Sequence, residues 1–295
     1  MTRGDPESPL RWTSKSVRKL AAELHRMRHQ TSHRMVAAWL QEMGDSLPAN
    51  RKTLEGSTHP DREAQFEHIH QTVKAFQALD HPAISVEANK QELVGDCTNQ
   101  GRELRPQGAP ERVRGHDFAI PELGKVAPSG VYDQTQHTGW VNGGTDHDTA
   151  AFAVASIRRW WPTMGQAVYP HARRLLITAD SGGSNGYRTR LGKTELPKVA
   201  HETGLELSVC HLPPGTSQWH TIAHRLCSSI SQNWRGKPLV SHEVSVTLMA
   251  STTTRTGLPV RCELDTTTAP QGIRITDQEL HQVNMMRDHC HGDWN

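Results

Sequence analysis

Cysteine is scarce in this chain of 295 residues, and no two cysteines form a CxxC pair. The five are Cys97, Cys210, Cys227, Cys262 and Cys290. Their odd number and wide scatter argue against a disulfide framework and indicate a reducing compartment. The missing pairs argue against a structural zinc site. Long apolar runs are absent too: none approaches the roughly 20 residues of a membrane span, and the N-terminus lacks the apolar stretch of a secretory signal. We therefore expect a soluble, cytoplasmic protein without a membrane partner.

Charges of the two signs nearly balance over the whole chain, whose formal net charge is +2. Along the sequence the balance is uneven. Residues 1–60 hold ten Arg and Lys but six Asp and Glu, so this segment carries +4 and the remainder carries −2. A basic N-terminal segment favours a polyanion as partner. A solvated helix face is the alternative explanation.

Two short amphipathic helices are predicted in the basic segment. In the first, apolar residues recur at the i, i+3, i+4, i+7 spacing of one helix face, and Thr13 or Ser14 is in position to cap it. In the second, which Ser32 can cap and Gly44 can end, apolar residues again share one face. The apolar positions are Val17, Leu20, Ala21, Leu24, Val36, Trp39, Leu40 and Met43. Two such helices resemble a helix-turn-helix, whose second helix presents its first residues to the major groove of DNA. An ordinary helical hairpin is the alternative.

After a stretch of turn-forming residues at 45–60, strands and helices are expected to alternate. A helix is predicted over Asp61–Ala78. Strands follow around residues 83–87, 92–94, 131–132, 140–141, 174–180 and 205–212, and further helices begin near residues 149, 188 and 218. The unbroken apolar run Leu175-Leu176-Ile177 is typical of a strand buried on both faces. This order predicts an α/β protein with a mixed sheet flanked by helices.

Asp180 directly follows the most apolar of these strands and precedes a run of small residues, 181–186. In sheets of this kind ligands and metals gather at strand ends, and small residues allow a substrate backbone to approach. The position indicates a metal-binding carboxylate. Capping of a strand-to-turn junction is the alternative.

Several segments, in order along nearly the whole chain, resemble one family: the Rhodopirellula-type transposases, the ISAzo group of DDE insertion-sequence transposases. These segments include SPLRWTSKSVRKLAAEL, GWVNGGTDHDTAAFAVASIRRWW, RRLLITADSGGSNG and VCHLPPGTSQWHTIAHRL. The resemblance implies an RNase H-like core over 81–255, preceded by a linker helix within 56–80 and a helix-turn-helix segment, shortened at its N-terminal side, within 1–55. Residues 256–295 are then a C-terminal extension. It also implies a prokaryotic, nucleoid-associated protein that acts in DNA transposition.

The chemistry implied by the resemblance is phosphoryl transfer on DNA, in which three carboxylates hold two Mg²⁺ or Mn²⁺ ions. At the positions that match the family's motif this sequence has Glu87, Asp180 and Ala223. Glutamate in place of the first Asp moves the oxygens by about an ångström, and a misplacement of that size can cost about 100-fold in rate. The methyl group of Ala223 cannot bind a cation. We therefore expect a catalytically impaired copy, a pseudoenzyme.

Basic side chains of the predicted helix pair, of the region after Glu87 and of the region near position 223 are the expected contacts to double-stranded DNA at transposon ends. They are Arg26, Arg28, His33, Arg34, Lys90, Arg225 and Arg235. Two other hypotheses stay open. One is a DNA-binding remnant without chemistry that occupies transposon ends, and the other is an unstable relic that does not accumulate as a folded protein. A homo-oligomer is a further hypothesis, about the assembly.

Overall fold

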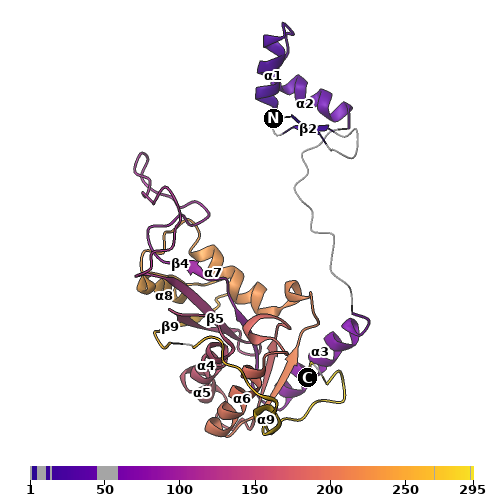
Figure 1. Cartoon of the computed structure of the whole chain (residues 1–295), viewed down its shortest axis with the longest axis vertical. Helices are drawn as coiled ribbons and strands as arrows, with labels where there is room; N and C mark the ends of the chain where they lie inside the picture. Colours follow the sequence, from indigo (N-terminus) through magenta and orange to yellow (C-terminus); the bar gives the residue numbers. More distant parts are fainter. Residues whose placement is uncertain (1, 5–10, 14, 45–58, 269, 293) are drawn as a thin grey trace. The chain divides into compact units, whose positions relative to one another are not determined.

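A computed structural model describes residues 2–4, 11–13, 15–44, 59–268, 270–292, 294 and 295. The chain divides into two compact units, Met1–Glu55 and Gly56–Asn295. Figure 1 shows the elements of each unit. In the first unit, β1 (Thr2–Gly4) pairs antiparallel with β2 (Arg11–Thr13), and α1 (Val17–Arg26) contacts α2 (His33–Glu42).

Serine side chains begin both helices of the first unit. Ser32 caps α2, as predicted, by accepting a hydrogen bond from a backbone N–H in the first turn. The expected cap of α1 was wrong. Ser16 accepts the corresponding hydrogen bond there, whereas Thr13 belongs to β2 and Ser14 lies outside the described residues. The helix therefore begins at Val17, the first of its predicted apolar positions, and only the cap lies later than expected.

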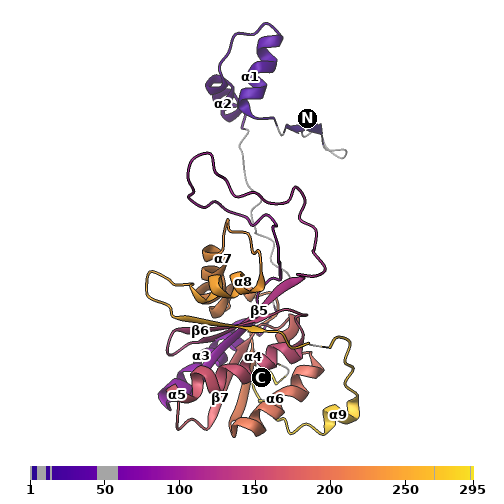
Figure 2. The same cartoon turned by 90° about the vertical axis from the view of Figure 1, so that its left-hand side faces the viewer.

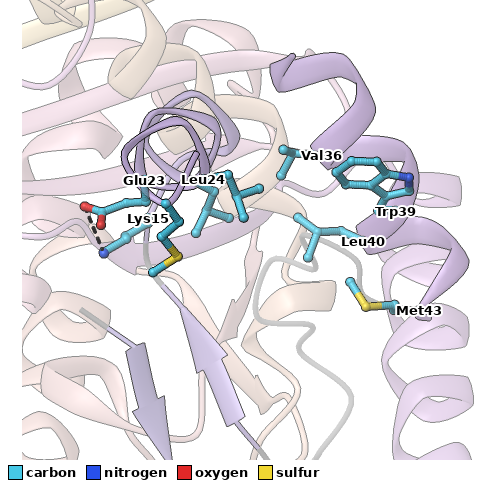
Figure 3. A pocket seen from close by; sticks show the side chains of 9 residues that line it. Lys15, Glu23, Leu24, Val36, Trp39, Leu40 and Met43 are labelled. Carbon is cyan, nitrogen blue, oxygen red and sulfur yellow. Dashed lines mark ion pairs between the residues drawn. The ribbon is translucent and has the colours of Figure 1, made fainter. Parts of the chain in front are cut away.

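An apolar groove lies between α1 and α2, and the two apolar faces predicted from the sequence form its walls. Its lining includes Leu20, Leu24, Met27, Val36, Trp39, Leu40 and Met43. In Figure 3 the groove is bordered by an ion pair in which Lys15 Nζ lies 3.5 Å from Glu23 Oε1. Among residues 15–44 only Ala21 and Val36 are buried. The apolar surface of the two helices therefore stays largely accessible within the described part of this unit.

A mixed sheet forms the centre of the second unit, in the strand order β8-β7-β3-β5-β6-β9, with β4 beside β5. The strands are β3 (Ala83–Ala88), β4 (Glu92–Leu93), β5 (Lys125–Asp133), β6 (Thr138–Gly144), β7 (Arg174–Ala179), β8 (Glu206–His211) and β9 (Val260–Asp265). The β3–β5 and β5–β6 pairs are antiparallel, whereas β7 is parallel to both β3 and β8. The mixed sheet predicted from the sequence is confirmed.

Helices cover both faces of this sheet. Figure 2 shows α4 (Ala150–Trp160) and α6 (Arg190–Thr203) on one face, and α7 (Ser228–Asn233) and α8 (His242–Ala250) on the other. The remaining elements are α3 (Arg62–Ala78), η1 (Trp161–Gly165), α5 (Gln166–Val168), η2 (Gly183–Asn185), η3 (Ser217–Trp219), η4 (Ala223–Cys227) and α9 (Asp277–His281). No helix in the described part of the chain combines the length and the apolar character that crossing a membrane requires.

Side chains of the central strand β3 alternate between the two faces, as the period of two requires. Ile84 and Val86 enter the core that α4 covers. Ala83 joins the core beneath α3, and the hydroxyl of Ser85 lies 2.8 Å from Nε2 of His220. The second face of β3 is thus the one that turns toward the segment after the Pro-Pro loop.

Two segments that the sequence placed outside the core are joined to the sheet. α3, expected as a linker helix, packs Ile69 and Phe76 against Leu176 of β7 and Cys210 of β8. β9, from the expected C-terminal extension, pairs in parallel with β6 from Gly139 to Gly144. The compact unit that begins at Gly56 includes both segments.

Candidate active site at the ends of β3 and β7

Glu87 and Asp180 lie next to each other at one end of the sheet. Glu87 is in β3, Asp180 directly follows β7, and these strands are parallel neighbours in which Ser85 pairs with Thr178. Since side chains two residues apart share a face, Glu87 is on the face of Ser85 and Asp180 is on the face of Thr178. Both carboxylates therefore project from the same face, at the carboxyl ends of adjacent strands.

The carboxylate of Glu87 is enclosed by the segment that follows the Pro-Pro loop. Its Oε2 accepts a hydrogen bond from Cys227 Sγ at 3.8 Å and lies 3.7 Å from His220 Nδ1. The His220 ring is buried, with only 1% of the residue exposed. Its Nδ1 has no hydrogen-bond partner among the described residues. Glu87 thus faces a thiol and an imidazole, and its side chain stays 21% exposed.

Burial changes the protonation of both groups. Burial, followed by the negative charge of Asp180, raises the pKa of Glu87 from 4.5 to about 7, although the Cys227 thiol and His224 act in the opposite direction. Burial lowers the pKa of His220 to about 4. The His220 ring is therefore neutral at pH 7 and gives Glu87 no counter-charge. About half of the Glu87 side chains carry a proton at that pH.

Ala223 begins the π-helical turn η4, which ends at Cys227. It follows His220 by three residues and precedes Cys227 by four. The side chains of His220 and Cys227 both lie within 4 Å of the Glu87 carboxylate. The methyl group that is present offers no ligand.

The residues around Glu87 do not fit a pair of divalent cations. The oxygens of Glu87 and Asp180 suit Mg²⁺ or Mn²⁺. The other nearby donors are the nitrogen of His220 and the sulfur of Cys227, and Mg²⁺ favours neither. Within the residues that the structure describes, no group of three His, Cys, Asp or Glu is arranged to hold a metal ion. The site has two carboxylates, whereas a pair of bridged cations needs three carboxylates.

The DNA contacts predicted in the second unit do not all lie at the acid pair. Lys90 is in the turn after β3, with its Nζ 3.4 Å from Glu92 Oε1. Arg225 is exposed two residues after Ala223. Arg235 lies instead beside the loop at Gly101, where its side chain fills the space next to the glycine Cα. Of the three, Lys90 and Arg225 belong to segments that carry the site.

The other four predicted DNA contacts are exposed residues of the first unit. Arg26 forms an ion pair with Glu23 on α1. Arg28, in the turn between the helices, has a φ of 67°, a left-handed conformation that side chains other than glycine rarely adopt. His33 and Arg34 open α2, as expected from the sequence.

Sequence reasoning singled out the three motif positions but missed Ser85 and Cys227. Signals for both are present. Ser85 precedes Glu87 by two residues and so shares its strand face, and Cys227 lies in the same short helix as Ala223. What the sequence could not supply is the pairing of these two segments, because it is made by residues 140 positions apart.

The second unit is an α/β protein with a mixed sheet flanked by helices, and acidic residues lie at the ends of its central strand and of the parallel neighbour. The chain belongs to the family described as Rhodopirellula transposase DDE domain, which matches residues 1–295. The family expected from the sequence is therefore confirmed, together with the mixed sheet flanked by helices.

Among curated proteins, none matches the chain. Of the solved structures, the Mos1 transposase paired-end complex with left transposon end is similar at 15% identity and a TM-score of 0.44, over 78% of this chain and 64% of that one. The Mos1 mariner paired end complex with Mn is similar at 15% identity and a TM-score of 0.40, over 82% and 70%. The simian T-cell lymphotropic virus intasome in complex with PP2A regulatory subunit B56 gamma follows at 9% identity and a TM-score of 0.29, over 88% and 78%. The chain thus spans 64% of the length of the first of these proteins.

Proposed function

We propose that this chain is a transposase-type protein that binds double-stranded DNA at transposon ends and whose metal-dependent strand cleavage and transfer are impaired. One observation carries the proposal. Ala223 lies in the chain segment between His220 and Cys227, both of which contact the Glu87 carboxylate, and a carboxylate at this position would be the third acid of the motif. Membership of a transposase DDE domain family supports the substrate class.

Protonation of Glu87 adds to the loss of the third carboxylate. Metal ligands bind in their deprotonated form, so the affinity of such a site depends on pH. With a pKa of about 7, Glu87 is partly protonated at neutral pH, and a cation that binds there has to displace this proton. Asp180 is then the only one of the three motif positions that keeps the residue expected from the family.

Non-catalytic DNA binding is the second candidate function. It is favoured by the exposed cations on α1, α2 and the turn between them, a pattern suited to phosphate contacts. In this alternative the chain occupies transposon ends without cutting them, and the acid pair is a vestige. Both candidates require DNA binding, and they differ in whether a restored acid brings cleavage.

Restoring the motif tests the proposal. The full chain and the variants Ala223→Glu and Ala223→Glu/Glu87→Asp are compared for nicking of duplex DNA that carries the element's terminal repeats, with Mg²⁺ or Mn²⁺. We expect no measurable nicking by the parent chain and metal-dependent nicking by Ala223→Glu. Because a one-ångström misplacement can cost about 100-fold, the added Glu87→Asp change should increase the rate by up to that factor.

Ala223→Gln is the matched control, since its side chain has the shape of glutamate but no charge. We expect it to stay inactive. Cleavage by the parent chain at the rate of the double variant would contradict impairment. DNA binding by every variant with cleavage by none would favour the second candidate.

A further inference from the structure

Trp219 is an exposed tryptophan directly before His220, whose ring lies close to the Glu87 carboxylate. It ends the 3₁₀ turn η3, and 58% of the residue is exposed. By contrast Trp140, Trp160 and Trp234 are at most 5% exposed. The indole ring of Trp219 lacks the burial that the other three rings have, so a partner that covers it would bury this apolar surface.

The backbone that carries this ring is fixed. Trp219 N donates to Thr216 O at 2.8 Å. The next residue, His220, is buried, with its ring between Ser85 and Glu87. The ring of His224 bonds to the backbone oxygen of Gln218. Hydrogen bonds therefore hold the backbone around Trp219 in place. The next residue, His220, has its Nδ1 3.7 Å from the Glu87 carboxylate.

The surroundings of Trp219 are polar and cationic. Gln218, Thr221, His224 and Arg225 are all exposed. A single aromatic ring among polar neighbours does not form the extended apolar patch that marks a protein-binding surface. An aromatic face with a guanidinium nearby suits a nucleotide instead, because every base has a face that stacks and every phosphate accepts from arginine.

In intact duplex DNA the faces of the bases are covered by their neighbours, so a protein ring can stack only on an unpaired or extruded base. We propose that Trp219 is a base-stacking platform that takes an unpaired nucleotide of the DNA strand end held at the acid pair. The inference rests on the proposed function and specifies the substrate. It is a DNA end with unpaired bases rather than a flush end.

The test measures binding of the full chain, in a chelator that prevents cleavage, to terminal-repeat duplexes with either a flush end or a three-nucleotide overhang. The overhang contains 2-aminopurine, whose fluorescence falls on stacking. The variants are Trp219→Ala and Trp219→Phe, with Phe118→Ala as control, because Phe118 is also an exposed aromatic residue, at 72%. Since Trp219 is on the surface, none of these changes removes a core side chain.

We expect the overhang duplex to bind more tightly than the flush duplex and its fluorescence to be quenched. Trp219→Ala should weaken overhang binding by about 5- to 100-fold, the range for loss of one base–aromatic stack, and abolish quenching, while flush binding stays the same. Trp219→Phe should keep most of both effects, and Phe118→Ala all of them.

Equal losses on both duplexes, or no loss on either, would overturn the stacking role and leave DNA binding intact. Failure of the parent chain to bind either duplex would overturn the proposed function and, with it, this inference.

Discussion

Replacing Glu87 by glutamine is expected to stabilise the folded protein at alkaline pH and to change its stability little at pH 4.5. The amide keeps the shape of the protonated acid but cannot ionise. The pKa of Glu87 rises from 4.5 to about 7 on folding, which corresponds to about 3 kcal/mol at roughly 1.4 kcal/mol per pKa unit. The side chain keeps 21% of its exposure, so solvent screens part of this energy. We expect about 2 kcal/mol.

The sign follows from proton linkage. Between pH 4.5 and 7 the folded state holds the Glu87 proton that the unfolded state has released, so the folded state binds more protons there. Its stability is therefore complete below pH 4.5 and declines as the pH rises through about 7. Above pH 8 the parent chain carries a buried charge that the variant lacks. The advantage of Glu87→Gln should thus appear between pH 4.5 and 8 and then stay constant.

Urea unfolding at pH 4.5, 6 and 8.5, in a chelator and followed by the fluorescence of the buried tryptophans, measures this difference. Glu67→Gln is the matched control, because Glu67 is exposed on α3, and we expect it to have little effect at any pH. Asp180→Asn removes the second cause of the raised pKa and should move the decline to lower pH. Parallel stability curves for the parent chain and Glu87→Gln would refute the reasoning.

Two predictions concern the first unit. Binding of the full chain to duplex DNA should weaken steeply with salt, and Arg34→Ala should reduce the slope of log K against log salt by about one, as for one lost phosphate contact; an unchanged slope would exclude Arg34 from the interface. Arg28→Gly should relieve the left-handed backbone at φ 67° and stabilise the turn by about 0.5–1 kcal/mol, seen as slower amide exchange in α1. Arg28→Ala keeps the strain, so equal protection in the two variants would contradict that explanation.

Local patterns were sufficient for the parts of the fold that depend on neighbouring residues. The apolar run at Leu175–Ile177 predicted the buried strand β7, and the spacing from Val36 to Met43 predicted the face of α2 that lines the groove. Capping was harder, because several serines and threonines precede α1. Ser16 was preferred to Thr13, which β2 uses for pairing with Thr2. A distant strand partner thus decided a local choice.

Long-range pairing was beyond the sequence for a different reason. Residues 260–265 follow the alternation of an edge strand, yet nothing local shows that they run parallel to β6 rather than forming a separate extension. Likewise, the apolar stripe of α3 predicted that the helix packs on something, but not that its partners are Leu176 and Cys210. Such contacts depend on where the chain returns, and a periodicity contains no information about that.

Protonation of Glu87 on β3 and the missing acid at Ala223 in η4 both affect metal binding at this site. His220 and Cys227 cover Glu87 with a neutral ring and a thiol. Burial, followed by the negative charge of Asp180, raises the pKa of Glu87, and the hydrogen bond from Cys227 opposes that rise. A carboxylate at position 223 would place a further negative charge near Glu87 and, without a cation, would raise that pKa again. A bound cation would reverse the effect, because it favours the ionised form of every carboxylate around it. Restoring the acid should therefore couple metal binding and proton release at this site more strongly than in the parent chain.

The coupling can be measured as the number of protons released per Mn²⁺ bound at pH 7. We expect a larger release by Ala223→Glu than by Ala223→Gln. Equal release would show that position 223 does not face the acid pair.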